Sequence, residues 1–196
     1  MPRHNEPMPK RYFDLSDDMS IPGRWVLGPP TDVQGREVED PWMFYRGERL
    51  PDLGRLKLPL DVPGKALDFS LAAFEAPVIH ARVASVLTEL APEDVQTLPV
   101  EIEGQSEQFF ILVATKLIRC IDEKATEEFQ KWTPEDGRPA KVGKYRDVWG
   151  MRIDASQVGD TKVFRAWGWP IVLIVREEIR DALELMGATG TKFDEV

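Results

Sequence analysis

The C-terminal stretch KVFRAWGWPIVLIVREEIRDALELMGATGTKFDEV, residues 162–196, decides the expected fold because it contains a complete strand, helix and strand pattern. Residues 171–175 form an apolar, largely β-branched run that is typical of a buried strand. An amphipathic helix should follow, ending at Gly187 or Gly190, because glycine adopts the left-handed C-terminal conformation at low cost. The apolar face of this helix comprises Ile179, Ala182, Leu183 and Met186.

Upstream of this stretch, strand and helix patterns are mixed. Residues 77–90 predict a second helix, with Pro77 in its first turn and an apolar face at helical spacing. The step Val62-Pro63-Gly64-Lys65 predicts a type II turn, in which proline presets φ and glycine accepts a positive φ. Residues 123–131 fit either a short polar helix or an extended segment. Short strands are expected at residues 25–27, 42–45, 56–60, 67–71, 98–102, 109–113, 148–153 and 162–167.

These elements do not alternate as regularly as they do in a doubly wound fold. We therefore expect an α+β protein with mixed, largely antiparallel sheets, two main helices and a C-terminal strand–helix–strand unit. Residues 1–9 are polar and contain three prolines, which predicts a flexible arm. The remainder is expected to divide near residue 75, into a β-rich N-terminal subdomain (10–75) and an α+β C-terminal subdomain (76–196).

The composition excludes several classes of protein. The 196 residues include 42% hydrophobic residues, enough for a packed core, and 34 acidic against 25 basic side chains give a net charge of −9. This charge disfavours binding to nucleic acid or to an anionic membrane and favours a basic partner. No apolar run approaches the ~20 residues of a membrane span, and the start of the chain lacks the apolar core of a signal peptide. With a single cysteine, we expect a cytoplasmic protein.

A catalytic or metal centre is not expected from the residue types present. The chain has only two histidines, His4 and His80, too few for the usual zinc sites. His80 and Cys120 could in principle form a base and nucleophile, but a cysteine within an apolar strand is more typical of core packing. Clustered carboxylates could perform acid–base chemistry or bind a cation, although such clusters are more often solvated surfaces. The sequence therefore predicts a non-enzymatic protein without cofactor or metal.

The best candidate for a partner-binding site is the polar loop that ends near Trp42. Large aromatic residues are common interface anchors, and here Glu37, Glu39, Asp40 and Pro41 precede the tryptophan. We therefore predict that Glu37, Glu39, Asp40 and Trp42 contact the partner. Two other acidic surfaces remain open as alternatives, the segment 101–107 and the acidic face of the helix within 177–184.

The chain also resembles a known family. The carrying segments are YFDLSDDM and PGRWVLGPP near the start, LDFSLAAFEAPVIHARVASVLTELAPEDVQTLPVEIEG in the middle, and VWGMRIDASQVGDTKVFRAWGWPIVLIVREEIRDALELMGATGTKFDEV at the end. From about residue 10 onward the pattern is similar to an immunity-protein family of bacterial polymorphic toxin systems. That family was formerly a domain of unknown function and is typified by myxobacterial kin-discrimination immunity proteins. It has no catalytic signature, and no functional residues are carried over.

The resemblance implies a small cytoplasmic protein that binds and neutralises a toxin encoded beside it. The best-known cognate toxins of the family resemble nucleases, so the expected partner is a basic toxin domain. Two alternatives stay open, namely an adaptor or scaffold for a secreted effector and an enzyme that uses a carboxylate cluster. A deep pocket with convergent carboxylates would favour the enzyme, whereas an acidic surface with exposed aromatic residues would favour the toxin binder.

Overall fold

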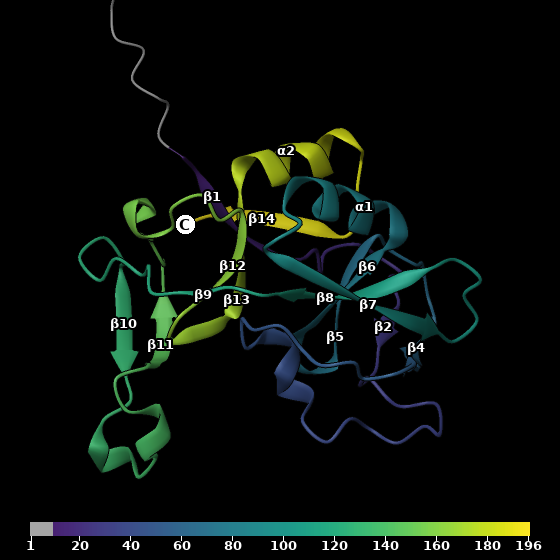
Figure 1. Ribbon diagram of the computed structural model, residues 1–196, viewed down its shortest axis with the longest axis horizontal. Helices are drawn as coiled ribbons and strands as arrows, with labels where there is room; N and C mark the ends of the chain where they lie inside the picture. Colours follow the sequence, from purple (N-terminus) through teal and green to yellow (C-terminus); the bar gives the residue numbers. More distant parts are fainter. Residues whose placement is uncertain (1–9) are drawn as a thin grey trace, which may run out of the picture.

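The computed structural model describes residues 10–196, which form 14 strands, two α-helices and five short 3-10 helices (Figure 1). The predicted arm, residues 1–9, and His4 lie outside this described part. The α-helices are α1 (Ala81–Leu90) and α2 (Glu177–Leu185), and the 3-10 helices are η1 (Pro41–Tyr45), η2 (Ala73–Glu75), η3 (Pro134–Asp136), η4 (Pro139–Lys141) and η5 (Ala155–Gln157). The strands are β1 (Tyr12–Asp17), β2 (Val26–Leu27), β3 (Leu56–Leu58), β4 (Leu60–Val62), β5 (Phe69–Ala72), β6 (Ala76–His80), β7 (Val95–Ile102), β8 (Phe109–Ala114), β9 (Leu117–Ile118), β10 (Glu128–Lys131), β11 (Tyr145–Trp149), β12 (Val163–Ala166), β13 (Trp169–Arg176) and β14 (Thr191–Glu195).

Two five-stranded sheets organise the molecule. The first has the strand order β14-β1-β13-β12-β9, and the second has the order β3-β7-β8-β6-β5. Within them only the β9–β12 and β3–β7 pairs are parallel, which confirms the predicted α+β class with mixed, largely antiparallel sheets. Each sheet combines strands from both sides of residue 75, since β1 pairs with β13 and β5 pairs with β6. The predicted subdomain division therefore does not coincide with a division between the sheets.

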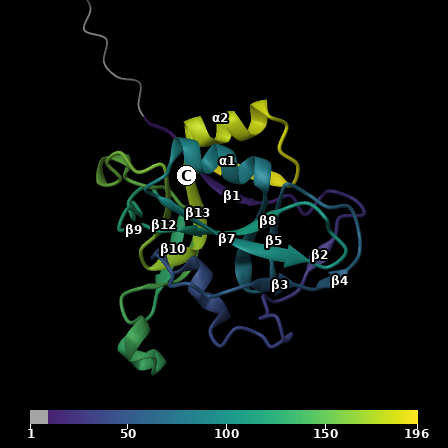
Figure 2. The ribbon, with the colours of Figure 1, turned by 45° about the vertical axis from the view of Figure 1, so that its right-hand side comes forward.

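The central strands of each sheet are buried on both faces, whereas outer strands such as β14 are partly exposed. A central core lies between the sheets and includes the apolar faces of α1 and α2, which lie on the same side of the molecule (Figure 2). Residues of the N-terminal segment cover the other face of the second sheet, with Trp25 and Phe44 at the centre of that core. The other face of the first sheet is covered by residues 118–158, including Cys120 and Met151. Strands buried on both faces explain the long apolar runs in β8 and β13.

The C-terminal strand, helix and strand form as predicted. β13 passes directly into α2, whose Ile179 and Leu183 are fully buried in the central core. After the helix, Gly187 adopts φ of +66°, and its N–H donates to the carbonyl of Glu184. Gly190 also has a positive φ, +88°, and an added Cβ there would lie 2.1 Å from the Phe69 carbonyl oxygen. Gly187 thus ends the helix, and Gly190 permits close packing of β14 on the second sheet.

The two sheets share a topology that the sequence does not reveal. The first unit consists of the hairpin β5–β6, helix α1 and strand β7, with β8 inserted antiparallel between β6 and β7. The second unit consists of the hairpin β12–β13, helix α2 and strand β14, with β1 inserted antiparallel between β13 and β14. In both units the strand that precedes the helix, β6 or β13, continues directly into it without a loop. The same supersecondary arrangement therefore occurs twice.

The predicted helix 77–90 is too long at its N-terminal end. Residues 77–80 belong to β6, and α1 begins only at Ala81, with His80 as its N-cap. The Nδ1 atom of His80 accepts from the Arg82 N–H at 3.2 Å, which satisfies one free donor of the first turn. Val78 and Ile79 lie opposite Ile111 and Phe110 of β8. Backbone pairing with a distant strand therefore overrides a local pattern that fits helical spacing.

Two further expectations are wrong for local reasons. Residues 42–45 form the 3-10 helix η1 instead of a strand, because Pro41 occupies its first turn and the Asp40 carboxylate caps it. The segment 62–65 forms no type II turn, because Gly64 lacks a positive φ. Instead, Lys65 forms an isolated parallel β-bridge with Arg24. A Cβ on Gly64 would lie 2.6 Å from the Gly23 carbonyl oxygen, so this glycine permits a close backbone approach.

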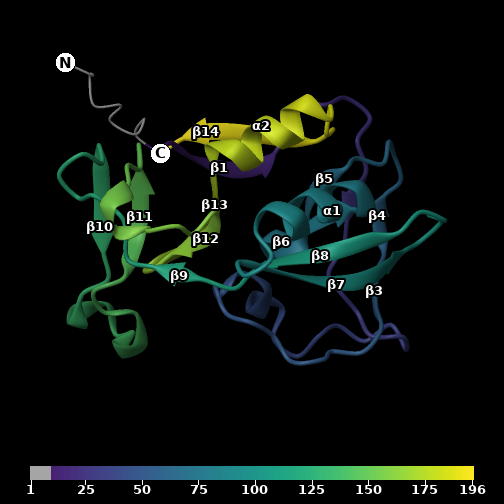
Figure 3. The same cartoon turned by 45° about the horizontal axis from the view of Figure 1, so that its top comes forward.

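The structure decides the alternative left open for residues 123–131, because residues 123–127 form turns and bends and not a helix. Residues 128–131 are extended, forming β10, which pairs antiparallel with β11 (Tyr145–Trp149). β11 begins earlier and ends earlier than the strand expected at 148–153. Residues 132–144 connect the two strands and carry η3 and η4. This β10–β11 hairpin projects from the two large sheets (Figure 3).

Candidate partner-binding surface

Trp42 lies on η1, a short helix that is fixed at several points. Phe44 points into the core and is fully buried, whereas the Trp42 side chain is 46% exposed. The Asp40 carboxylate accepts from the Trp42 N–H at 3.2 Å, and it also pairs with the Arg46 guanidinium. Pro41 restricts φ at the first position of the helix. The loop that the sequence singled out therefore presents its tryptophan from a well-anchored backbone.

Two aromatic rings support the exposed indole. The Trp42 ring meets Phe74 edge-on, with a centroid distance of 4.9 Å, and Tyr45 at 5.7 Å. Phe74 and the next residue, Glu75, are non-glycine residues with φ of +61° and +57°. Such left-handed conformations cost about 1–3 kcal/mol each and persist where the surrounding structure demands them. The strained β5–β6 turn thus places Phe74 under Trp42.

A buried charge lies behind this aromatic cluster. Arg165 on β12 is 1% exposed, and its Nη1 atom donates to the Ile171 carbonyl oxygen at 3.0 Å. Its Nε and Nη2 atoms have no hydrogen-bond acceptor among residues 10–196. Burial lowers the pKa of Arg165 to about 10, and the nearby charges of Asp14 and Glu75 oppose this shift. Burial in turn raises the pKa of Glu75, and the charge of Asp17 adds to the rise.

The acidic residues beside Trp42 differ in what they contact. Asp40 is committed to capping η1 and to Arg46. Glu37 and Glu39 are exposed, and neither forms an ion pair with another residue in the described part of the chain. Glu37 and Glu39 are therefore available to a basic partner, whereas Asp40 mainly holds the Trp42 backbone in place.

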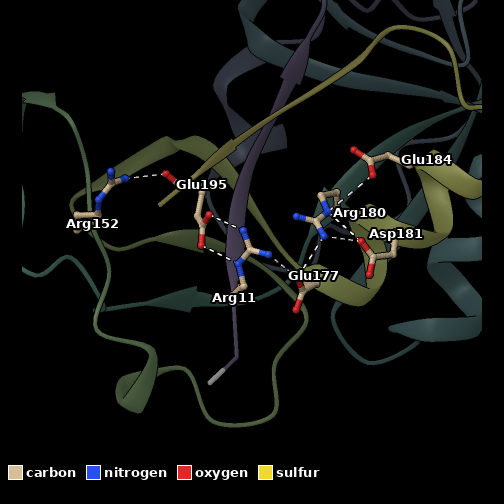
Figure 4. Close-up of polar contacts among 7 residues, drawn as sticks. All are labelled: Arg11, Arg152, Glu177, Arg180, Asp181, Glu184 and Glu195. Carbon is tan, nitrogen blue, oxygen red and sulfur yellow. Dashed lines mark hydrogen bonds and ion pairs between the residues drawn. The ribbon is translucent and has the colours of Figure 1, made fainter. Parts of the chain in front are cut away.

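The acidic face of α2, the first alternative surface, is largely neutralised by basic neighbours (Figure 4). Arg11 donates to both carboxylate oxygens of Glu195, at 2.8 and 2.6 Å, and to Glu177 at 2.9 Å. Arg180 pairs with Glu177 and, at 2.6 Å, with Asp181. These contacts join β1, α2 and β14 near both ends of the described chain. This network stabilises the fold and offers a partner fewer free carboxylates than the Trp42 loop does.

The second alternative surface, residues 101–107, is partly committed in the same way. Arg55 pairs with Glu101 at 2.8 Å, and the His80 Nε2 atom lies 3.7 Å from a Glu107 carboxylate oxygen. Glu103 forms no ion pair with the other described residues. None of the exposed large hydrophobic side chains of residues 10–196 belongs to this segment. It therefore lacks the aromatic anchor that accompanies the acids at Trp42.

The alternative based on His80 and Cys120 finds no support in their surroundings. His80 caps α1, and its ring meets Phe109 edge-on at 5.1 Å. Cys120 is buried in the third core, and desolvation raises the pKa of its thiol to about 12. A thiol with so high a pKa is a poor nucleophile at neutral pH. Within residues 10–196, no three His, Cys, Asp or Glu side chains gather into a candidate metal site.

Sequence reasoning missed the most exposed tryptophan. Trp149, on β11 of the projecting hairpin, is 71% exposed, compared with 46% for Trp42. Its neighbours across the hairpin are polar. In β10, Phe129 alternates with Glu128 and Gln130, and this alternation indicates that one face of the hairpin is exposed to solvent. The strand expected at residues 148–153 omits the first three residues of β11, so the corresponding alternation in β11 is not recognised. The correct register places Trp149 opposite Glu128.

Comparison with models of known protein families finds no match for this chain, and comparison with curated proteins finds none either. The resemblance to immunity proteins therefore stays a prediction. Neither α1 nor α2 has the length and apolar character needed to cross a bilayer.

Proposed function

We propose that this protein is a non-enzymatic, cytoplasmic immunity protein that binds and neutralises a basic bacterial toxin, a nuclease encoded beside it. The observation that carries the proposal is the Trp42 loop, where an exposed indole rests on Phe74 and Tyr45 beside Glu37 and Glu39. The sequence resemblance supplies the toxin as the partner. The exposed indole and the carboxylates beside it indicate how a basic partner would be recognised.

A surface of this kind divides the work of binding between two sets of residues. Exposed carboxylates attract a basic partner over a long range and mainly raise the association rate. A rigid aromatic side chain buried in the complex contributes to affinity and lowers the dissociation rate, because little conformational entropy is lost on binding. η1 and the Phe74 turn keep Trp42 in one position before the partner arrives. The acidic groups should therefore affect mainly the association rate, and Trp42 should affect mainly the dissociation rate.

The test measures neutralisation and kinetics with the toxin domain encoded next to this gene. Co-expression should restore growth of cells that produce the toxin. In surface plasmon resonance at two salt concentrations, Glu37→Lys with Glu39→Lys should lower the association rate and its salt sensitivity. Trp42→Ala should chiefly raise the dissociation rate, with a loss of about 2 kcal/mol if the ring is a hot spot. Asp40 is left unchanged because its substitution would also remove the cap of η1.

Matched controls separate local contacts from general effects. Glu89→Lys with Glu93→Lys makes the same charge change at exposed positions on and just after α1, and Met19→Ala removes another exposed apolar side chain. Both controls should bind as the wild type does. Unchanged kinetics in the Glu37/Glu39 and Trp42 variants would remove this loop from the interface. Binding without loss of toxicity would instead favour the adaptor alternative.

A further inference from the structure

We propose that the outward face of the β10–β11 hairpin is a second docking surface, which accepts an extended protein segment bearing arginine or lysine at alternate positions. This face comprises Glu128, Gln130, Asp147 and Trp149. Together with Phe129, these residues line one hollow of about 120 Å³. The proposal stands apart from the Trp42 loop and does not depend on the toxin being the partner.

The opposite face of the hairpin explains why these side chains are held outward. Phe129 and Tyr145 meet edge-on at 5.9 Å, and Lys131 lies over both rings. The Tyr145 hydroxyl donates to Glu123 at 2.7 Å, while Val148 packs against the third core. With one face fixed in this way, strand alternation directs the other face to solvent.

The register of the hairpin defines the spacing of its acidic groups. Glu128 lies opposite Trp149, and Gln130 lies opposite Asp147. Glu128 and Asp147 are therefore diagonal neighbours, roughly 7–8 Å apart by the usual dimensions of an antiparallel pair. In an extended peptide, side chains two residues apart project on the same side at roughly 6.6–6.8 Å. Two basic residues at alternate positions thus match the two carboxylates.

The chemistry of the face selects a cationic partner. Neither Glu128 nor Asp147 forms an ion pair within residues 10–196, whereas the nearby Lys131 is committed to Glu123 at 2.5 Å. Trp149 is mostly exposed beside them, and the face of an indole attracts arginine and lysine head groups. Carboxylates and an indole together therefore offer a basic segment both charge pairing and cation–π contact.

The tip of the hairpin carries Arg138 and Lys141 beside Trp132, and these basic side chains limit where a basic segment can lie. Three cationic groups surround the Trp132 ring, Arg138 and Lys141 of the tip at 5.1 Å and Arg146 of β11 at 5.2 Å from its centroid, and Arg146 also pairs with Asp136 at 3.4 Å. A basic segment would be repelled from this tip and held along the stem, over Trp149. The acidic character that recruits the segment is therefore local to the stem.

The experiment uses the full chain and a synthetic peptide of sequence Arg-Thr-Arg-Thr-Arg, with blocked ends, in isothermal titration calorimetry at low salt. The block peptide, Arg-Arg-Thr-Thr-Arg, has the same composition, but no two of its arginines are at alternate positions. We expect the alternating peptide to bind several-fold more tightly than the block peptide. Glu128→Gln with Asp147→Asn should weaken its binding by about tenfold, and Trp149→Ala should also weaken it.

The matched control is Glu89→Gln with Glu93→Gln, which removes the same charge at exposed positions on and just after α1 and should leave peptide affinity unchanged. Thermal melting identical to the wild type confirms that each variant is folded. Wild-type affinity in the hairpin variants, equal loss in the control, or no binding of the alternating peptide would each overturn the proposal. Because no toxin is used, failure of toxin neutralisation would leave this result standing.

Discussion

The two strand–helix–strand units have the same topology but close in different ways. In the first unit, β8 follows β7 through the short turn at residues 103–108 and then fills the place between β6 and β7. In the second unit, the corresponding place is filled by β1, from the opposite end of the chain. The first unit can therefore form from a contiguous segment, whereas the second forms only when the N-terminal strand joins the C-terminal one.

This difference extends to the composition of the inserted strands. β8 has the sequence FFILVA, apolar throughout, and is buried on both faces. β1 has the sequence YFDLSD, and Asp14 lies opposite Ile174 on one side and Asp194 on the other. The second unit is additionally held by the ion pairs of Arg11, directly before β1, to Glu177 on α2 and to Glu195 on β14. Equivalent topology thus allows different means of stabilisation.

The largest expected effect comes from removing residues 171–196, which deletes α2, β14 and most of β13. β1 would lose both of its partners, and the central core would lose Ile179 and Leu183. We expect an insoluble or molten product, detected by loss of the near-ultraviolet circular dichroism signal and of cooperative melting. Cooperative melting near the full-length temperature would show that the first unit folds independently and that the second is dispensable.

A smaller effect compares equivalent positions on the two helices. Leu87 on α1 and Leu183 on α2 are both 0% exposed and belong to the same central core. Leu87→Ala and Leu183→Ala should each lower the free energy of unfolding by about 2–5 kcal/mol, because each leaves a cavity. Urea denaturation measures both. As an exposed control, Leu185→Ala removes a leucine that is 91% exposed and should change stability by less than about 0.5 kcal/mol. A cost below 1 kcal/mol for either buried leucine would contradict the shared core.

The smallest effect concerns Asp14 and depends on pH. Burial raises the pKa of its carboxyl from 3.8 to about 6, and the charge of Asp194 contributes in the same direction. The folded state therefore binds a proton more tightly than the unfolded state, so this group lowers stability as pH rises through the interval from about 4 to 6. Asp14→Asn should stabilise the protein at pH 7.5 by about 1 kcal/mol, a value reduced for partial solvent exposure.

At pH 4 most of the advantage of Asp14→Asn should disappear, because the carboxyl is then protonated in the folded state and close to its ordinary pKa of 3.8 in the unfolded state. Thermal denaturation at the two pH values checks this prediction. Asp181→Asn, at a carboxylate on the exposed side of α2, is the comparison variant and should not show the same gain at pH 7.5. A pH-independent effect of Asp14→Asn would point to packing instead of ionisation.

Local patterns in the sequence were sufficient for much of the fold. The apolar run in β13, the stripe on α2 and Gly187 after it define the second unit, and the alternation at 98–102 and the run at 109–113 predict β7 and β8. Their signal lies within the element itself, because side-chain periodicity reports which face is buried. The partner-contact prediction for Trp42 rested on different local information, the acids and the proline beside it, and the ring is 46% exposed.

Other features depend on residues that are far apart along the chain. β1 occupies the centre of a sheet only because β13 and β14 lie on both sides of it, and residues 77–80 are extended because β8 pairs with them. Gly64 fits its place because another backbone approaches it, and Trp149 is exposed because the register of the hairpin turns it outward. The sequence by itself determined the elements with their own periodicity. The tertiary structure decided the features whose free energy comes from partners distant in the chain, since no local window contains both members of such a contact.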